Sequence, residues 1–169
     1  MKDLWKRVLA QMEGAAGEAL GQAYVQVAFP PESRDRMQKL VDMSGTDGLT
    51  ALPNRTWLMH RFPAMLDAIR GQGGSLSVCL IDLDYFKRIN DELGHLAGDR
   101  ALRHVVDLLK QQMEDGDWLA RLGGEEFALL LPLPTGRAWE RLETMRRTTA
   151  SQPFLPEHGA EPMRRTFSA

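Results

Sequence analysis

The run Gly123-Gly124-Glu125-Glu126 constrains the fold more than any other stretch of this sequence. Apolar segments of strand-like composition flank it on both sides. Glycines supply the positive φ angles of a tight turn, so the sequence predicts a β-hairpin over residues 118–131 with both carboxylates at its tip. Two adjacent acids about 4 Å apart repel each other by roughly 4 kcal/mol at an effective dielectric near 20. We therefore expect a metal or phosphate site here rather than a merely solvated turn.

A second group of acids follows a predicted strand. Residues 76–81 are mostly apolar and run directly into Asp82-Leu83-Asp84. Mg²⁺ prefers oxygen ligands and often binds one or two carboxylates together with substrate phosphates. If this strand pairs with the hairpin, Asp82 and the two glutamates would complete such a site. The alternative is that Asp82 and Asp84 cap the following helix, and this can hold for Asp84 while Asp82 is a ligand.

Three segments together resemble the GGDEF family of diguanylate cyclases. They read DGLTALPNR at 47–55, DLDYFKRINDELGHLAGD at 82–99 and GGEEF at 123–127. The last is similar to the signature of the family in its GGEEF form, and the other two are similar to its D-x-L-T-x-L-x-N-R and D-x-D-x-F-K-x-x-N-D-x-x-G-H-x-x-G-D blocks. The order and spacing are those of the family, and the resemblance covers about residues 45 to 135.

The resemblance implies a catalytic and metal-binding set at the ends of the strands. Asp82, the backbone carbonyl of Leu83 and Glu125 would bind Mg²⁺ or Mn²⁺. Glu126 would lie beside the reacting groups, as a further metal contact or as a helper in activating the hydroxyl. The expected catalytic residues are therefore Glu125, Glu126 and Asp82.

The resemblance also implies which residues bind the nucleotide. Asn90 and Asp99 would read the guanine edge, because an Asp can accept from N1–H and N2–H while an Asn amide can donate to the acceptor atoms of the base. Leu102 would form part of the wall against the ring. The remaining substrate-binding positions are expected to be the two hairpin glycines and a segment that wraps the terminal phosphates mainly through backbone N–H groups: Gly123, Gly124, Tyr85, Phe86 and Lys87.

The reaction that the resemblance implies is the condensation of two GTP molecules into cyclic di-GMP with release of two pyrophosphates. Each 3′-hydroxyl attacks the α-phosphate of the other nucleotide, and catalysis of this kind rests on positioning and charge neutralisation. One domain holds one GTP, so a homodimer is expected. The alternative is a catalytically weak domain that binds GTP or cyclic di-GMP as a sensor.

The sequence departs from the family pattern in two places. Many members carry an inhibitory Arg-x-x-Asp site six residues before the signature, where this chain has Asp117 but Glu114 in place of the arginine. We therefore expect cyclic di-GMP not to bind tightly at this turn. The family normally continues past residues 165–168 with a glycine-containing strand and a last helix, so the domain is expected to be incomplete at its C-terminus, with weak turnover if the molecule ends at Ala169.

Composition and patterning set the domain organisation. The 169 residues are 43% hydrophobic, enough for one domain with an appendage, which we place at 45–169 and 1–44. Residues 1–44 are expected to form an amphipathic helical arm. The net charge of −2 disfavours nucleic-acid binding. The single cysteine, Cys79, fits a core strand in a reducing cytoplasm, and no apolar run approaches the roughly 20 residues that span a bilayer.

The first residues carry a second, weaker resemblance. Residues 4–42 are similar to a segment of the neprilysin-like zinc peptidases, but the sequence contains no His-Glu-x-x-His motif. Its four histidines have no metal-ligand spacing, so a metallopeptidase is the disfavoured hypothesis.

The order of elements predicts an α/β (α+β) fold, similar to the nucleotidyl cyclase and polymerase palm arrangement, with an antiparallel sheet and helices on one or both faces. The expected helices span 54–70, 98–113 and 137–149, and the expected strands span 76–81, the 118–131 hairpin and 163–168.

Overall fold

The chain divides into two compact units, Met1–Ser44 and Gly45–Ala169. The computed structural model describes residues 45–156 and 162–169, all within the second unit. The helical arm predicted for residues 1–44 therefore lies outside the described residues.

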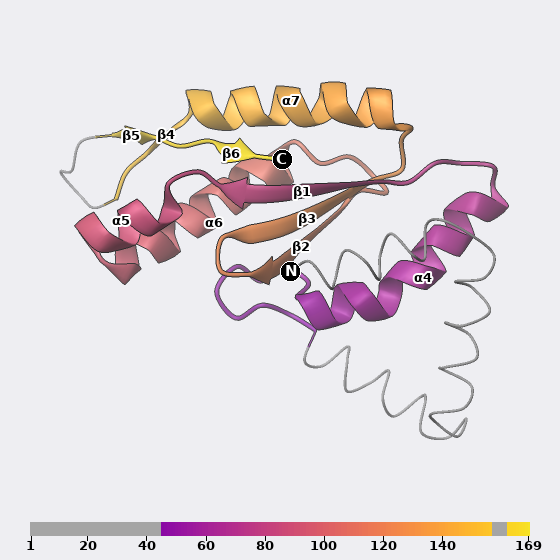
Figure 1. The fold of residues 1–169 in the computed structure, drawn as a ribbon, viewed down its shortest axis with the longest axis horizontal. Helices are drawn as coiled ribbons and strands as arrows, with labels where there is room; N and C mark the ends of the chain where they lie inside the picture. The colour runs from indigo at the N-terminus through magenta and orange to yellow at the C-terminus, as the bar shows by residue number, and fades with distance from the viewer. Residues whose placement is uncertain (1–44, 157–161) are drawn as a thin grey trace, which may run out of the picture. The chain divides into compact units, whose positions relative to one another are not determined.

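The second unit alternates helices with strands (Figure 1). In chain order its elements are α4 (Arg55–Gly71), β1 (Ser77–Leu83), α5 (Phe86–Leu93), α6 (His95–Gln111), β2 (Trp118–Gly123), β3 (Glu126–Leu131), α7 (Thr135–Ser151), β4 (Pro153–Phe154), β5 (Met163–Arg164) and β6 (Phe167–Ser168).

A four-stranded antiparallel sheet in the order β2-β3-β1-β6 forms the centre of this unit. β1 pairs with β3 along its length, from Ser77 opposite Leu131 to Asp82 opposite Glu126. The short β6 pairs only with the end of β1, and β4 and β5 form a separate two-stranded ladder. The predicted antiparallel sheet with flanking helices is confirmed, and the acidic end of β1 lies between two neighbouring strands.

The main hydrophobic core lies between one face of the sheet and the helices α5, α6 and α7. The apolar residues of α6 recur at helical spacing, so one face of that helix is fully buried. β3 contributes every second side chain to this core. The core residues from these elements include Phe86, Ile89, Leu102, Val105, Val106, Leu109, Phe127, Leu129, Leu131, Leu142 and Met145.

α4 covers the opposite face of the sheet. The Asn54 side chain caps this helix by accepting a hydrogen bond from the backbone N–H of Trp57 at 3.0 Å. The Trp57 ring lies 5.2 Å from the ring of Trp118 on β2. Trp118 pairs with Leu130, which alternates along β3 with the residues of the main core. The helix is therefore on the face that α6 and α7 leave open, and both faces of β3 are buried.

Several predicted boundaries were wrong. α6 begins at His95 rather than at residue 98, because Gly98 is accommodated inside a buried helix face. β1 continues to Leu83, so Asp82 is a member of the strand instead of following it. The strand predicted over 163–168 is two short strands in different ladders, β5 and β6.

Candidate functional site

The Gly123–Gly124 turn has the predicted backbone geometry. Gly123 has a φ of 145° and Gly124 a φ of 55°, a region that favours glycine. The pairing of β2 with β3 shifts register between Arg121 and Gly123, as in a β-bulge. Glu125 consequently lies in the turn itself and Glu126 is the first residue of β3. The predicted hairpin is confirmed, with both carboxylates at its tip.

The sheet brings the third predicted acid to this hairpin. Asp82 on β1 is the direct antiparallel partner of Glu126. Residues directly opposite one another in such a pair place their side chains on the same face of the sheet. The backbone N–H of Leu83 also donates to the Glu125 carbonyl at 3.3 Å. The end of β1 is thus joined to the Gly123–Gly124 turn through the backbone.

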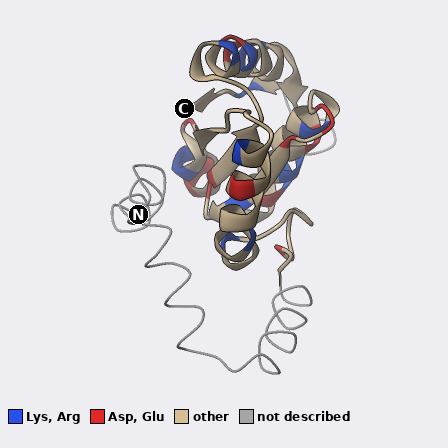
Figure 2. Cartoon of the chain, turned by 90° about the vertical axis from the view of Figure 1, so that its right-hand side faces the viewer, with Lys and Arg blue, Asp and Glu red and all other residues tan. Residues whose placement is uncertain are grey.

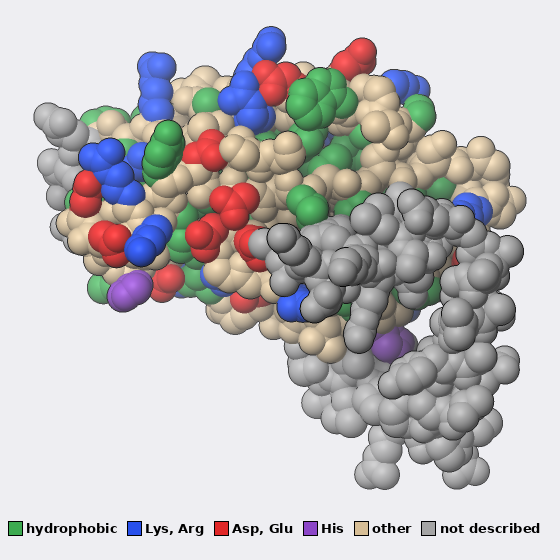
Figure 3. All heavy atoms as spheres, in the orientation of Figure 1, with side chains coloured by type: hydrophobic (Ala, Val, Ile, Leu, Met, Phe, Trp, Pro, Cys, Tyr) green, Lys and Arg blue, Asp and Glu red, His purple; other side chains and the backbone are tan. Residues whose placement is uncertain are grey.

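Asp82 lies among other acids at this end of the sheet. Desolvation and the neighbouring charges of Glu125 and Asp84 raise the pKa of Asp82 above its usual value. Within residues 45–156 and 162–169, no cationic side chain forms an ion pair with Asp82. Figure 3 shows acidic side chains gathered near the middle of this face, in the region where Figure 1 places the end of β1. Such a group attracts cations.

The described residues contain no group of three or more Cys, His, Asp or Glu side chains arranged to hold a metal ion. Mg²⁺ is commonly held by one or two carboxylates and completed by substrate phosphates and water. Asp82 and Glu125 supply hard oxygen ligands whose mutual repulsion a cation would relieve. The residues present therefore fit a site that is completed by the nucleotide.

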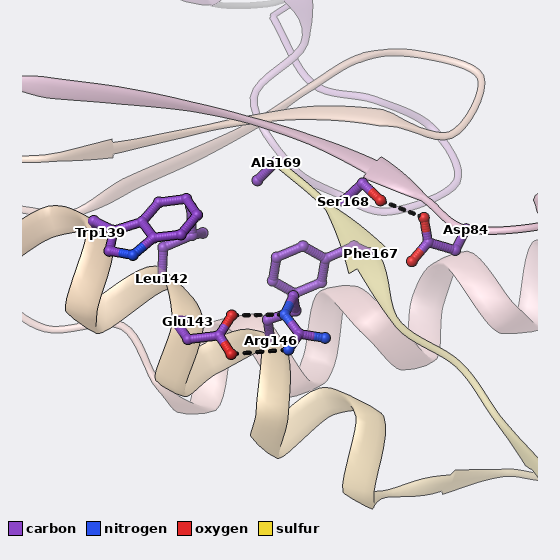
Figure 4. A pocket seen from close by; sticks show the side chains of 8 residues that line it. All are labelled: Asp84, Trp139, Leu142, Glu143, Arg146, Phe167, Ser168 and Ala169. Carbon is purple, nitrogen blue, oxygen red and sulfur yellow. Dashed lines mark hydrogen bonds and ion pairs between the residues drawn. The ribbon is translucent and has the colours of Figure 1, made fainter.

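Asp84 does not cap the following helix. The N-cap residue of α5 is Tyr85, and it makes no side-chain capping hydrogen bond. Asp84 instead accepts a hydrogen bond from the hydroxyl of Ser168 at 2.6 Å (Figure 4). Its backbone N–H donates to the Thr166 carbonyl at 3.1 Å. The capping alternative is wrong because β6 reaches Asp84 before the helix begins.

The turn between β1 and α5 contains the segment predicted to wrap phosphates. Tyr85 has a left-handed φ of 59°, which is uncommon for a residue with a side chain, and its ring is 76% exposed. Phe86 is buried in the core, so only its backbone can contact a ligand, while Lys87 is exposed. The first N–H groups of α5 lack helical partners and lie directly after the acidic end of β1.

The two residues predicted to read guanine lie on adjacent helices. Asn90 is on α5 and Asp99 on α6, and both are half-buried. The Asn90 side chain lies over Gly98, where an added Cβ would come 2.0 Å from its Oδ1 atom. Leu102 is only 1% exposed and belongs to the core beneath them. Gly98 thus lets the Asn90 amide sit directly against α6.

A cavity of about 330 Å³ lies between α7 and the end of β6 (Figure 4). Trp139 and Leu142 line one side of it, and the ring of Phe167 lines another. Glu143 pairs with Arg146 at 2.7 Å, and hydrogen bonds from Arg146 and Arg147 lower the pKa of its carboxyl to about 2. The sequence analysis did not identify this cavity, because it depends on how α7 packs beside β6.

The 114–117 turn is held by a residue that the sequence analysis missed. The guanidinium of Arg141 on α7 donates to both carboxylate oxygens of Asp117, at 3.1 and 2.6 Å. It also donates to the Gln112 carbonyl at 3.1 Å and lies 3.4 Å from a carboxylate oxygen of Glu114. The Asp117 side chain is only 1% exposed. An arginine is therefore present at this turn, but it comes from a distant part of the sequence.

Charges of both signs are interspersed over the view in Figure 2, in keeping with the small net charge. In the part of the chain that the structure describes, no helix is both long enough and apolar enough to cross a membrane.

Comparisons with known proteins agree with this geometry. The family described as "Diguanylate cyclase, GGDEF domain" matches residues 44–169. Diguanylate cyclase DgcP of Pseudomonas aeruginosa is 41% identical over 145 residues, which are 84% of this chain and 20% of that protein. Diguanylate cyclase TpbB of the same species is 41% identical over 104 residues, 61% of this chain and 24% of that protein. The chain thus spans about a quarter or less of the length of these relatives.

Solved structures give the same result. The GGDEF domain of DgcB from Caulobacter crescentus, in complex with c-di-GMP, superimposes with a TM-score of 0.68 at 28% identity, covering 73% of this chain and 74% of that one. Diguanylate cyclase SiaD of Pseudomonas aeruginosa, in complex with its activator SiaC, gives a TM-score of 0.67 at 30% identity, covering 99% of this chain and 61% of that one.

The resemblance noted for residues 4–42 lies outside the described residues. The sequence match, the antiparallel sheet and the acidic hairpin agree, and they show that this chain belongs to the GGDEF domain family of diguanylate cyclases.

Proposed function

We propose that this chain condenses two GTP molecules into cyclic di-GMP with release of two pyrophosphates, in a Mg²⁺-dependent reaction at the interface of a homodimer. The observation that carries the proposal is the register of β1 and β3, which places Asp82 opposite Glu126 beside a turn that contains Glu125. The family match and the relatives named diguanylate cyclases support the reaction class.

Asp82 and Glu125 would hold the divalent cation, with the backbone carbonyl of Leu83. The bound cation would neutralise charge on the phosphates. Glu126, the cross-strand partner of Asp82, would accept the proton of the attacking 3′-hydroxyl. Attack forms a bond between that oxygen and the α-phosphorus, and the bond to the pyrophosphate oxygen breaks. The contribution of the protein is positioning and electrostatics rather than covalent catalysis.

The phosphates would lie against the first turn of α5, with Lys87 adding positive charge. Unpaired N–H groups and the helix dipole favour an anion at this position. The guanine edge would then meet Asn90 further along the same helix and Asp99 on α6. Because one set of these residues serves one nucleotide, the second GTP has to come from a second copy of the domain, and a homodimer follows from the chemistry.

The direct test is incubation of the protein with Mg²⁺ and GTP, followed by chromatographic separation of the products. Cyclic di-GMP and pyrophosphate should appear in a ratio of one to two, and removal of the metal with a chelator should stop the reaction. Binding of GTP without product in the presence of Mg²⁺ would instead support the alternative of a non-catalytic sensor domain.

Base recognition is tested separately by Asp99→Ala. Loss of the acceptor leaves guanine N1–H and N2–H unpaired, so the affinity for GTP measured by calorimetry should fall by roughly 1–3 kcal/mol. Binding of ATP, which the pocket does not read, should change little. Equal weakening of both nucleotides would contradict the assignment of Asp99 to the guanine edge.

The site of product binding follows from the same assignment. The Arg141 guanidinium is already bonded to Asp117, and Glu114 adds a negative charge beside it. Cyclic di-GMP is therefore proposed to bind against Asn90 and Asp99 rather than at the 114–117 turn. In calorimetry with cyclic di-GMP, Asp99→Ala should abolish binding and Glu114→Ala should not. The reverse pattern would overturn this assignment.

A further inference from the structure

The carbonyl of Gly124, at the tip of the catalytic turn, is held by a guanidinium from the preceding strand. Arg121 on β2 donates to this oxygen through Nε at 3.1 Å and through Nη2 at 2.8 Å. Two donors on one acceptor fix both the position of the carbonyl and the plane of the guanidinium. The peptide that they hold links Gly124 to Glu125, one of the proposed metal ligands.

The third donor of the same guanidinium reaches a segment far away in the sequence. Arg121 Nη1 donates to Asp47 Oδ1 at 2.9 Å, and both side chains are largely buried, with 13% and 23% of their surface exposed. Desolvation opposes ionisation of Asp47, but hydrogen bonds from Thr50 and Arg121 outweigh it and hold the pKa of this carboxyl below its usual value. The pair is therefore charged on both sides at neutral pH.

Asp47 is itself fixed by the loop formed by residues 45–54. Its Oδ1 atom accepts hydrogen bonds from the backbone N–H and the hydroxyl of Thr50, at 2.9 and 2.7 Å. Asn54 donates from its backbone N–H to the Gly45 carbonyl at 2.7 Å, which closes the loop. A second link to β2 runs from the backbone N–H of Arg121 to the Pro53 carbonyl at 2.9 Å. The loop and the hairpin therefore have few independent degrees of freedom.

Besides the backbone bond from Leu83 to the Glu125 carbonyl, the Gly123–Gly124 turn has few constraints of its own. Both glycines are exposed, and an added Cβ on either would meet no atom within 4 Å. The register shift between Arg121 and Gly123 interrupts the ladder just before the turn. Glycines without neighbours retain many backbone conformations, so the angles required to aim Glu125 at the metal have to be imposed from outside the turn.

We propose that Arg121 is a positioning residue that clamps the Gly123–Gly124 turn to the 45–54 loop, and that this clamp couples the placement of Glu125 to the position of the chain at Gly45. The inference rests on the proposed function for its catalytic consequence, while the clamp itself can be tested without turnover. Each of the three guanidinium nitrogens of Arg121 donates to Gly124 or Asp47, and within the described residues no hydrogen bond or ion pair is found between Arg121 and Asp82 or Glu125. It acts on the reaction only through the turn.

The test combines hydrogen exchange with kinetics on four variants. Arg121→Ala removes the clamp, Arg121→Lys keeps the charge without the planar fork, and Asp47→Asn weakens the link to the loop while leaving both bonds to Gly124. Arg147→Ala serves as the control, because this arginine on α7 is 75% exposed and lies outside the proposed catalytic and binding residues. Circular dichroism establishes that each variant is folded.

In the absence of nucleotide, amide exchange in the peptide covering residues 122–127 should be faster in Arg121→Ala by about tenfold or more, in line with loss of a constraint on a small turn. Asp47→Asn and Arg121→Lys should show smaller increases, and Arg147→Ala none. With Mg²⁺ and GTP, kcat of Arg121→Ala should fall by about 10²-fold, while KM changes less than about threefold, because a misplaced catalytic group costs rate and not ground-state binding.

Unchanged exchange in Arg121→Ala would overturn the clamp, whatever the kinetics. Faster exchange with unchanged kcat would overturn its positioning role. An Asp47→Asn variant identical to the parent in both measurements would overturn the coupling to Gly45, even if Arg121→Ala does not fold. If the parent makes no cyclic di-GMP, the proposed function fails, and the exchange experiment still decides whether the clamp exists.

Discussion

Asp82 lies in β1 and Asp117 directly precedes β2 of the same sheet, but the two carboxylates differ in burial and in the charge around them. Asp117 is almost fully buried, and the Arg141 guanidinium binds both of its oxygens. Asp82 is exposed and faces Glu126 across the ladder, and the charges of Glu125 and Asp84 contribute to raising its pKa. A buried acid with a complete set of partners holds the structure together. An acid that the fold leaves among other acids is a place where a ligand has to supply the positive charge.

The difference separates stability from function along the chain. Asp117 directly precedes β2, the first strand of the hairpin. Asp82 lies near the end of β1, which pairs with β3, the second strand of the hairpin, so the same sheet supports both acids. At the Asp117 end the protein supplies its own counter-charge from α7. At the Asp82 end the counter-charge is expected from the metal ion. Mutations at the Asp117 end should therefore reduce the free energy of unfolding, whereas mutations at the Asp82 end should reduce the rate of turnover.

The largest effect is expected where the buried pair is broken. Arg141→Leu leaves the Asp117 carboxylate buried with only the Glu114 N–H donating to it at 2.8 Å, so the free energy of unfolding should fall by roughly 3–5 kcal/mol. Chemical denaturation measures this directly. The exposed Arg147→Leu is the matched control and should cost less than about 1 kcal/mol. If the two variants were equally stable, Asp117 would have to be reassigned as a solvated surface acid.

At the other end the effect should fall on rate. Glu125→Gln removes a metal-binding charge from an electrostatically stabilised transition state, so turnover should drop by about 10²–10³-fold. The variant should fold as well as the parent, since Glu125 lies in the turn and outside the hydrophobic core. The measurement is cyclic di-GMP formation at saturating GTP and Mg²⁺. Full activity in a folded Glu125→Gln protein would remove this residue from the site.

A smaller effect, of opposite sign to Arg141→Leu, is expected for Asp82→Asn. Like charges directly opposite in an antiparallel pair destabilise it by an amount on the order of 0.2–1 kcal/mol. Removing one of them should raise the melting temperature of the metal-free protein slightly, and it should also reduce the stabilisation that added Mg²⁺ gives the parent. Calorimetric melting with and without Mg²⁺ tests both statements. A loss of stability in the metal-free variant would show that Asp82 has a favourable partner.

The smallest effect is the pH dependence of the stability that metal-free Asp82→Asn gains over the parent. Because the folded-state pKa of Asp82 is raised, the folded protein takes up this proton more readily than the unfolded chain, and the repulsive cost is present only above the raised pKa. The stability advantage of Asp82→Asn should therefore be full at neutral pH and shrink as the pH falls through the raised pKa toward 3.8. A difference that grew on acidification would mean that the pKa of Asp82 is lowered instead.

Local patterns in the sequence were sufficient to predict the hairpin and the proximity of Asp82 to the two glutamates. Two glycines between apolar segments require a tight turn, and the alternation along β3 leaves Glu126 at its start, so the meeting with Asp82 follows once the strands pair. What these patterns left open was the continuation of β1 through Asp82, because strand ends depend on which neighbour is present to pair.

The residues that sequence reasoning missed are joined over long separations. Arg141 contacts Asp117, and Arg121 contacts Asp47, through side chains that only the packing of separate elements brings together. Nothing in the local sequence distinguishes these two arginines from exposed ones such as Arg147. Their signal is the burial of a charged group next to its partner, a property that only the three-dimensional structure shows.

The contact between Asn90 and Gly98 has a consequence for changing which base the pocket accepts. The amide rests on the backbone of another helix, so its height above α6 is set by the distance between α5 and α6. A larger side chain in place of Asn90 would contact α6, and a methyl group added at residue 98 would clash with the Asn90 side chain. Under the proposed assignment of Asn90 to the guanine edge, nucleobase selectivity depends on the spacing of α5 and α6, and re-engineering it requires that both helices be redesigned together.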